Sequence, residues 1–400
     1  MNICSLFALR GLSLVREGGY FGFLLPKVVV KNQAYEPIRK KLLTEFDLTR
    51  VLDFGQFPGV ASDAVGLIAR KSRPGRRTLV SGLDGITLEE RGSIDQSVFR
   101  SAAGNVLAIG ITAAVSRILS KVERGSIPIS ELLSVTRGIE LGQKSILLKC
   151  PDCQTYNETG TKYYGPQERV CQNCGARLPK AGGERLSVSS ASRSGVYEHP
   201  CISGRQIQRY LVEGTYFIPG SLKGVDYKQD SFHGPMVLLK RISTRPAGTF
   251  VHHDQLCFNT VYSLRPAGGH DENLLFRVLG LLNSKVMAFY FEKTYNIGMN
   301  LTTQVTMDVL RRLPLRTFGS VVDSSIARSA EELAKLGEQI AGFGATVTDR
   351  RRALETRFEQ VDTELESVIG KAYGLTPEEI RLINSEAASS NATKVVGTDT

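Results

Sequence analysis

The sequence predicts an α/β segment, forming an incomplete doubly wound sheet, followed by an α+β region and a helical hairpin. Three observations support this fold class. Helical and strand-like apolar patterns alternate in the first 70 residues, short strand-like runs between turns follow from residue 127, and two long charged helical patterns occupy 323–369. The expected parts are a partial sheet domain at 1–75, a connecting region at 76–126, a mostly β domain at 127–318, the hairpin at 319–384 and a disordered tail at 385–400.

The amino-terminal part is expected to run helix, strand, helix, strand, strand. Leucines within residues 6–15 form a helical apolar face that stops at Gly18, a helix-ending residue. Residues 20–25 form a continuous apolar run ended by Pro26, which is typical of a strand buried on both faces of a parallel sheet. The remaining patterns predict a helix at 35–46 and strands at 49–54 and 64–69.

This set of elements is an incomplete sheet. Doubly wound sheets need more than three strands to cover both faces. No glycine-rich turn between a strand and a helix opens the chain, so the usual cradle for a cofactor is missing. We therefore expect that Met1 lies in the middle of a fold and that residues 20–25 present an unpaired, apolar parallel edge.

The later parts are predicted from shorter patterns. Strand-like runs are found at 132–137, 145–149, 216–218, 236–242, 249–252 and 260–264. A helix follows at 273–295, then a short helix that ends at Leu313 and the two hairpin helices within 323–369. A last helix is expected after Thr376, a fair N-cap.

Charge and hydropathy restrict the class of protein. The chain has 50 Lys and Arg against 40 Asp and Glu, a formal charge of +10, and a pI near 9.2. This balance favours a polyanionic partner, although a solvated basic surface has the same composition. No apolar run approaches the roughly 20 residues of a membrane helix, and no secretion signal opens the chain. We therefore expect no membrane contact and a cytoplasmic protein with reduced cysteines.

Four cysteines have the spacing of a metal site. Cys150 and Cys153 form one Cys-x-x-Cys pair, and Cys171 and Cys174 form a second pair after 17 intervening residues. Two such pairs folded together offer four thiolates in a tetrahedron, so we predict a structural zinc ribbon at 147–178. Disulfides, or a redox or vestigial pair, are the alternatives.

The first 70 residues also resemble a known family. The motifs are Gly-Gly-Tyr-Phe-Gly-Phe-Leu-Leu-Pro at 18–26, Val-Leu-Asp-Phe at 51–54 and the segment that begins Phe57-Pro-Gly. They are similar to the later half of the catalytic domain of TaqI-like, adenine-specific DNA methyltransferases, which implies a Rossmann-like methyltransferase sheet. The resemblance also implies that Phe57 stacks on the flipped target base, which needs an aromatic surface outside the duplex. Alternatively, Phe57 only closes the edge of the sheet.

The resemblance continues into the target-recognition domain of the same family. Matching motifs begin at Arg137-Gly-Ile-Glu-Leu-Gly, His199-Pro-Cys-Ile-Ser-Gly, Leu281-Leu-Asn-Ser-Lys, Leu301 and Tyr373-Gly-Leu-Thr. The zinc ribbon then resembles an insertion in this domain. Candidate contacts to double-stranded DNA in the domain are Arg205, Arg209, Tyr210, Lys240, Arg241 and Arg245. For each single residue, an inert position on the surface is about as probable as a DNA contact.

The family's methyl-transfer motifs are absent from the sequence. Members bind S-adenosylmethionine at a glycine-containing turn and hold the adenine amino group with an Asn-Pro-Pro-Tyr-like tetrapeptide, and the chain has neither. We therefore assign no catalytic and no cofactor-binding residue, and expect S-adenosylmethionine only in a complete enzyme.

Three hypotheses remain for an adenine-N6 methylation system of restriction-modification or phage-defence type. The chain is the DNA-binding part of a split enzyme whose cofactor-binding half is a separate chain. Otherwise it is a non-catalytic DNA-specificity or assembly subunit, or an inactive truncated product. An upstream reading frame ending in an Asn-Pro-Pro-Tyr-like motif would favour the split enzyme.

Overall fold

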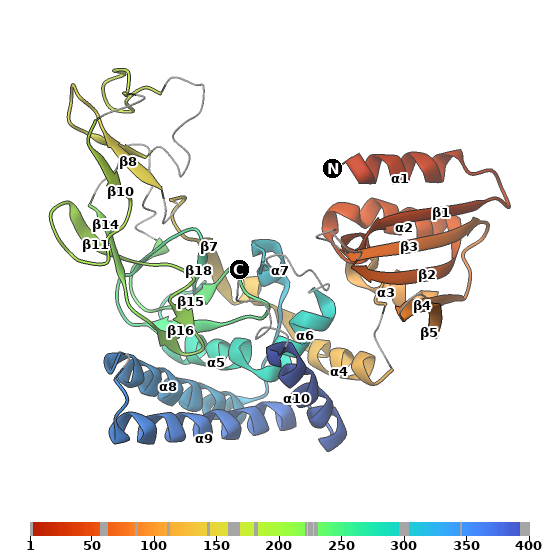
Figure 1. Ribbon diagram of the computed structural model, residues 1–400. Coiled ribbons are helices and arrows are strands. Elements are labelled where there is room, and N and C mark those ends of the chain that lie inside the picture. The colour runs from red at the N-terminus through yellow and green to blue at the C-terminus, as the bar shows by residue number, and fades with distance from the viewer. Residues whose placement is uncertain are drawn as a thin grey trace. The chain divides into compact units, whose positions relative to one another are not determined.

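The computed structural model describes two compact units. They are Met1–Ser120 with Tyr290–Thr303, and Lys121–Phe289 with Gln304–Thr400 (Figure 1). The described residues are 3–56, 63–84, 87–109, 113–141, 145–158, 169–179, 183–220, 222, 227, 231–295, 304–344 and 346–392. Phe57, the expected base-stacking residue, lies outside them, so its role stays a prediction.

The first unit contains a five-stranded mixed sheet. Its strands are β1 (Tyr20–Pro26), β2 (Phe46–Gln56), β3 (Asp63–Lys71), β4 (Arg77–Asp84) and β5 (Thr87–Asp95), in the order β1-β3-β2-β4-β5. Its helices are α1 (Ile3–Leu14), η1 (Lys27–Val30), η2 (Gln33–Tyr35), α2 (Glu36–Glu45), α3 (Gln96–Ser101) and η3 (Ala103–Asn105). The expected order of helix, strand, helix, strand, strand is therefore present at its start.

The pairing of β1 corrects one expectation. Its described partner is β3, which runs antiparallel to it, with Tyr20 opposite Arg70. Burial alternates along the strand: Phe21 and Leu25 are buried, whereas Leu24 is 55% exposed. The prediction of a strand in parallel pairing and buried on both faces is thus wrong, because an all-apolar run does not reveal which side chains are covered. Since β2 is also antiparallel to β3, β1 and β2 run in the same direction.

The same sheet includes part of the segment expected to be a connection. Within residues 76–126, β4 pairs parallel with β2, and β5 pairs antiparallel with β4. The strand β5 has exposed Glu89 and Glu90, and this polar pattern hid it from a search for apolar periodicity. The helix expected at 106–122 is α4 (Ala113–Glu123).

The core of the first unit lies between its helices and one face of the sheet. Leu12 of α1 and Leu42 of α2 are fully buried and cluster with Val65 and Leu67 of β3. Arg39 of α2 is also buried, and its guanidinium donates hydrogen bonds to the backbone carbonyls of Val29, Asn32 and Gly104. These bonds satisfy the buried charge and tie the loops beside α2 together.

The second unit is built from small sheets. A four-stranded sheet has the order β16 (Gly248–Val251), β15 (Met236–Lys240), β18 (Val261–Pro266) and β7 (Leu133–Arg137), all antiparallel. Two sheets have three strands, in the orders β14 (Tyr216–Pro219), β11 (Tyr197–Ile202), β17 (Leu256–Cys257) and β10 (Arg185–Ser187), β8 (Ile146–Lys149), β9 (Tyr156–Glu158). Two further sheets are pairs of strands: β12 (Ile207–Gln208) with β13 (Leu211–Val212), and β19 (Pro314–Arg316) with β6 (Ser126–Pro128). The mostly β character expected for this region is confirmed by these strands.

Helices complete the second unit. They are η4 (Ile129–Glu131), α5 (Glu272–Asn283), α6 (Lys285–Thr294), which continues into the first unit, α7 (Met307–Arg312), α8 (Ser320–Gly342), α9 (Asp349–Ala372) and α10 (Pro377–Ala392). The expected hairpin is present: α8 and α9 pack on each other, and α8 packs on α5. The helix α10 runs into the segment expected as a tail, and 393–400 lie outside the described residues.

The single helix expected at 273–295 is divided at Ser284. Ser284 has an extended backbone, its hydroxyl donates to the carbonyl of Leu281, and it accepts from the amide of Met287. One residue therefore ends α5 and begins α6, a device that apolar spacing cannot show. No single helix in the described part of the chain passes the length and apolarity test for a membrane span, and α5 with α6 passes only as a pair bent by 60°.

Candidate nucleic-acid interface and four-cysteine cluster

The four spaced cysteines come together in the second unit. Cys150 and Cys153 follow β8, and their Sγ atoms and those of Cys171 and Cys174 all lie within 4.8 Å of one another. The two loops have the same backbone hydrogen bond: the Cys150 amide donates to the Thr155 carbonyl, and the Cys171 amide donates to the Ala176 carbonyl. The residue after each second cysteine, Gln154 or Gly175, has a positive φ. The local sequence therefore forms two equivalent knuckles.

Distances and hydrogen bonds in this cluster fit a metal better than a disulfide. The sulfur atoms of Cys150 and Cys174 lie 3.6 Å apart, and those of Cys153 and Cys171 3.5 Å apart. Tetrahedral zinc with ligands at about 2.3 Å requires sulfur separations of about 3.8 Å, whereas a disulfide requires about 2.05 Å. Hydrogen bonds from Thr155 lower the pKa of the Cys153 thiol to about 5, whereas in Cys174 the neighbouring thiols outweigh the Ala176 amide and raise the pKa to about 12. The four residues could thus hold one zinc ion.

Four basic residues lie on the segments around a turn at 257–261, at one end of the four-stranded sheet, and the side chains of Arg137 and Arg241 contact the turn itself. Arg137 ends β7, Lys240 ends β15 and Arg241 follows it, while Arg205 lies in the turn between β11 and β12. The amide of Arg241 donates to the carbonyl of Thr260, and Lys240 pairs with Val261. We call Arg137, Arg205, Lys240 and Arg241 the basic turn cluster.

Two glycines allow the segments of this cluster to approach so closely. A Cβ at Gly138 would lie 2.1 Å from the carbonyl oxygen of Phe258, and a Cβ at Gly204 would lie 2.6 Å from that of Thr260. The Gly204 amide also donates to the Thr260 hydroxyl at 2.9 Å. A larger residue at either site would displace the neighbouring arginine from the turn.

The cluster contains half of the sequence candidates and one further arginine. Arg205, Lys240 and Arg241 are brought together here, with Arg205 exposed and the other two half-buried. Arg137 was not among the candidate DNA contacts, although it opens the motif at 137–142 that resembles the recognition domain. Its proximity to Arg241 depends on the pairing of β7 with β18, which the sequence did not indicate.

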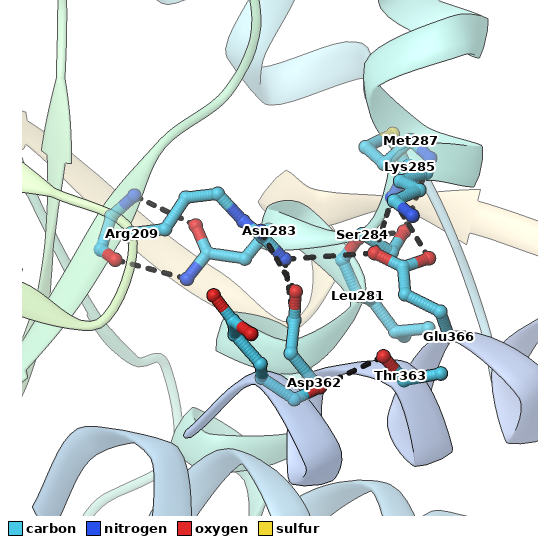
Figure 2. Close-up of polar contacts among 11 residues, drawn as sticks. Arg209, Leu281, Asn283, Ser284, Lys285, Met287, Asp362, Thr363 and Glu366 are labelled. Carbon is cyan, nitrogen blue, oxygen red and sulfur yellow. Dashed lines mark hydrogen bonds and ion pairs between the residues drawn. The ribbon is translucent and has the colours of Figure 1, made fainter. Parts of the chain in front are cut away.

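Arg209 and Tyr210 have a different position from the one expected. They form the two-residue turn between β12 and β13, and this turn packs against the hairpin. The Arg209 guanidinium makes two hydrogen bonds to Asp362 of α9, at 2.7 and 3.1 Å (Figure 2). Tyr210 is 1% exposed, and its ring meets that of Phe358 edge-on, with the two ring centroids 6.0 Å apart. Tyr210 is therefore covered by the hairpin, and the Arg209 guanidinium, with a side chain 22% exposed, is paired with Asp362; a DNA contact from either residue stays a prediction.

The same buried network includes a second carboxylate, and a second arginine lies near it. Glu366 lies 3.5 Å from Arg209 and accepts the amide of Lys285, the first residue of α6, at 2.8 and 3.0 Å (Figure 2). Burial raises the pKa of Glu366 to about 7, although the charge of Arg209 opposes this. Burial, and then the charge of Arg209, lower the pKa of Arg245, which indicates that this arginine lies near the network.

Comparison with known proteins identifies one domain, most of whose residues belong to the second unit. Residues 199–315 match the model of the TaqI-like C-terminal specificity domain. The chain contains a TaqI-like specificity domain. This confirms the resemblance drawn from the recognition-domain motifs. The specificity domain includes Arg205, Lys240 and Arg241, and Arg137 lies outside the matched residues.

The relatives and solved structures that resemble this chain align with it over only part of their own length. The Type II methyltransferase M.VspI of Vibrio sp. (strain 343) is 30% identical over 96 residues, which are 24% of this chain and 22% of M.VspI. The Type IIL restriction-modification enzyme MmeI, solved in complex with DNA, aligns with 98% of this chain and 53% of its own at 10% identity and a TM-score of 0.49. DrdV, in a DNA complex, aligns with 86% and 40% at 10% identity and a TM-score of 0.46. The chain thus spans about half of the length of MmeI, and a smaller share of the lengths of M.VspI and DrdV.

Proposed function

We propose that the chain is the DNA-recognition part of a site-specific adenine-N6 methyltransferase of restriction-modification or phage-defence type. Methyl transfer from S-adenosylmethionine to a flipped adenine would require a cofactor-binding half supplied by a separate chain. The observation that carries this proposal is the basic turn cluster, because it adds a concentrated positive charge to a specificity domain. Phe57 is proposed to hold the flipped base, as the family resemblance implies.

The chemistry of the cluster suits double-stranded DNA. Arginine and lysine contact phosphate oxygens, and arginine also reads guanine with two hydrogen bonds. The backbones of the three cluster residues within the specificity domain are placed by the ends of strands and by a tight turn, and the Arg241 side chain is held by hydrogen bonds to Asn259 and Gln304. A fixed arrangement reduces the entropy that binding would otherwise cost.

We also propose that zinc occupies the four-cysteine cluster. Four thiolates complete a tetrahedron and leave no position for substrate, so the ion would be structural. Its function in this chain would be to hold together a segment with a small core, in which Leu148, Cys150, Cys171 and Leu178 are the buried members.

The surface of the first unit supports the proposed partner chain. Large apolar side chains are exposed on α1 and β1: Ile3, Leu6, Phe7, Leu14, Tyr20 and Leu24. Among the described strands, β1 pairs only with β3, so one of its sides is an open edge. Apolar patches and open strand edges invite association, and a partner carrying further strands and helices would cover both.

Loss of the basic turn cluster should abolish DNA recognition. The variant carries Arg205→Ala, Lys240→Ala and Arg241→Ala, and its binding is compared with the unaltered chain on a pool of randomised short duplexes. We expect at least about 100-fold weaker binding, since each lost contact contributes about 1–3 kcal/mol. The measurement is a titration followed by fluorescence anisotropy, repeated at several salt concentrations.

A matched control removes the same charge elsewhere. Arg328, Arg352 and Arg381 are exposed residues of α8, α9 and α10, and their triple alanine variant should bind almost normally. If both triple variants lose binding equally, the chain attracts DNA only through its net charge and the proposal fails. Thermal unfolding of both variants verifies that they are folded.

The partner is tested by co-expression with an upstream product that has a glycine-containing cofactor turn and an Asn-Pro-Pro-Tyr-like motif. We expect a stable complex that methylates adenine, and its loss in the Leu6→Glu, Phe7→Glu variant, because charges replace the exposed apolar side chains of α1. DNA binding by this variant should be unchanged. Adenine methylation by the purified chain alone would refute the split arrangement, whereas DNA binding with no methylating complex would favour a non-catalytic specificity subunit.

A further inference from the structure

We propose that Arg137 and Arg241 form a paired clamp for one phosphate of the DNA backbone. This inference rests on the proposed DNA-recognition function and deepens it. It assigns a role to Arg137, which lies outside the matched specificity domain, and it separates a positioning contact from contacts that read bases.

The clamp is built on one backbone carbonyl. Nε of Arg137 donates to the carbonyl oxygen of Asn259 at 3.1 Å, and Nη1 of Arg241 donates to the same oxygen at 3.2 Å. The two guanidinium nitrogens therefore lie no more than about 6.3 Å apart. Two positive charges held so closely repel each other, and a shared anion relieves the repulsion. A shared acceptor thus prepares the pair for a negative ligand.

Both arginines are held by the fold. Arg137 pairs with Tyr262 across β7 and β18, and Arg241 is fixed by the bond from its amide to Thr260 and by the bond that its carbonyl accepts from Val305. Tyr262 is buried, which raises its pKa, and the charges of Arg241 and Arg137 oppose this rise. Both guanidiniums therefore lie near the Tyr262 hydroxyl as well as the Asn259 carbonyl.

The arrangement fits phosphate oxygens. A guanidinium is a planar fork of five N–H donors that matches phosphate with parallel hydrogen bonds. Arg241 also donates through Nη2 to the side-chain oxygen of Gln304 at 3.0 Å, which fixes the plane of its fork. One phosphate group of a DNA strand has enough acceptor oxygens for two such forks. The clamp would set the register of the duplex against the specificity domain.

Glu140 competes with the proposed phosphate. Its carboxylate lies 3.1 Å from Nη1 of Arg137, and its side chain is 58% exposed. An exposed ion pair contributes little stability, so a phosphate can displace it. The clamp therefore predicts effects of opposite sign for two neighbouring residues.

The test uses the full chain, a randomised duplex pool and a salt series. Arg137→Ala should weaken binding about 10-fold for all sequences and lower the slope of log K against log salt by about 0.9. Arg137→Lys should retain the slope, because the charge remains, while it loses affinity because the fork is gone. Glu140→Gln should bind more tightly than the unaltered chain, by about 2-fold, because a competing charge near the phosphate is removed.

Arg328→Ala is the matched control and should change neither affinity nor slope. If Arg137→Ala leaves both unchanged while Arg205→Ala with Lys240→Ala weakens binding, the clamp is wrong and the proposed function stands. If none of these changes affects binding, the proposed function itself fails. If Arg137→Ala instead alters which sequences the pool yields, Arg137 reads a base and the phosphate assignment is overturned.

Discussion

Replacing Cys150 by serine should release the metal and unfold the segment that holds the four cysteines. Three thiolates no longer complete the tetrahedron. Binding of structural zinc stabilises small zinc-finger peptides by about 10–16 kcal/mol. Without the ion little remains to order this segment, because the buried members of its cluster among the described residues are Leu148, Cys150, Cys171 and Leu178. Hydrogen exchange should therefore increase at 145–158 and 169–179.

The measurement is elemental analysis after purification without chelators, together with hydrogen exchange. The unaltered chain should contain one zinc ion, and Cys150→Ser should contain far less. Cys4→Ser is the control, since Cys4 lies in α1, far along the chain from the cluster. Well under one metal ion per unaltered chain would rule out the zinc site.

Replacing Arg209 by methionine should destabilise the second unit by about 3–5 kcal/mol, because the change leaves buried carboxylates without their partner. Asp362 and Glu366 have side chains that are 17% and 13% exposed, so water replaces Arg209 poorly. The measurement is urea unfolding at about pH 8 and about pH 5.5. Adding Asp362→Asn and Glu366→Gln to Arg209→Met should recover most of the loss, because no buried charge then lacks a partner.

The cost of losing Arg209 should depend on pH through Glu366. Its folded pKa, about 7, is above the ordinary 4.5, so the folded state binds a proton more readily between these values. The contribution of Glu366 to stability is complete below about pH 4.5 and is lost as the pH rises through about 7. Arg209→Met should therefore cost more at about pH 8, where Glu366 is ionised, than at about pH 5.5. An equal cost at both pH values would place the energetic effect elsewhere in the network.

Local patterns predicted much of the chain correctly. The apolar spacing of α8 and α9 indicated the hairpin, and short runs indicated β8 and the strands of the four-stranded sheet. The Cys-x-x-Cys spacing indicated a four-sulfur cluster, and the motif at 199–210 indicated the specificity domain. These features depend on residues close together in sequence, or on chemistry that the residue types themselves specify.

Other features could not be predicted because they depend on long-range partners. The sequence marked Arg209 as a DNA contact, but its carboxylate partner Asp362 is 153 residues away. An arginine that meets a buried carboxylate becomes structural, and one that meets another arginine at a half-buried turn becomes a candidate anion site. Nothing in the spacing of 205–210 distinguishes these outcomes.

By itself, therefore, the sequence determined many of the helical and extended segments, which cysteines cluster and which family the recognition motifs resemble. Only the tertiary structure decided that β1 pairs antiparallel with β3, that the hairpin covers Tyr210 and pairs with Arg209, and that Arg137 joins Arg241 at the carbonyl of Asn259. Periodicity and composition act within a segment, whereas burial and electrostatic partners arise when distant segments pack together.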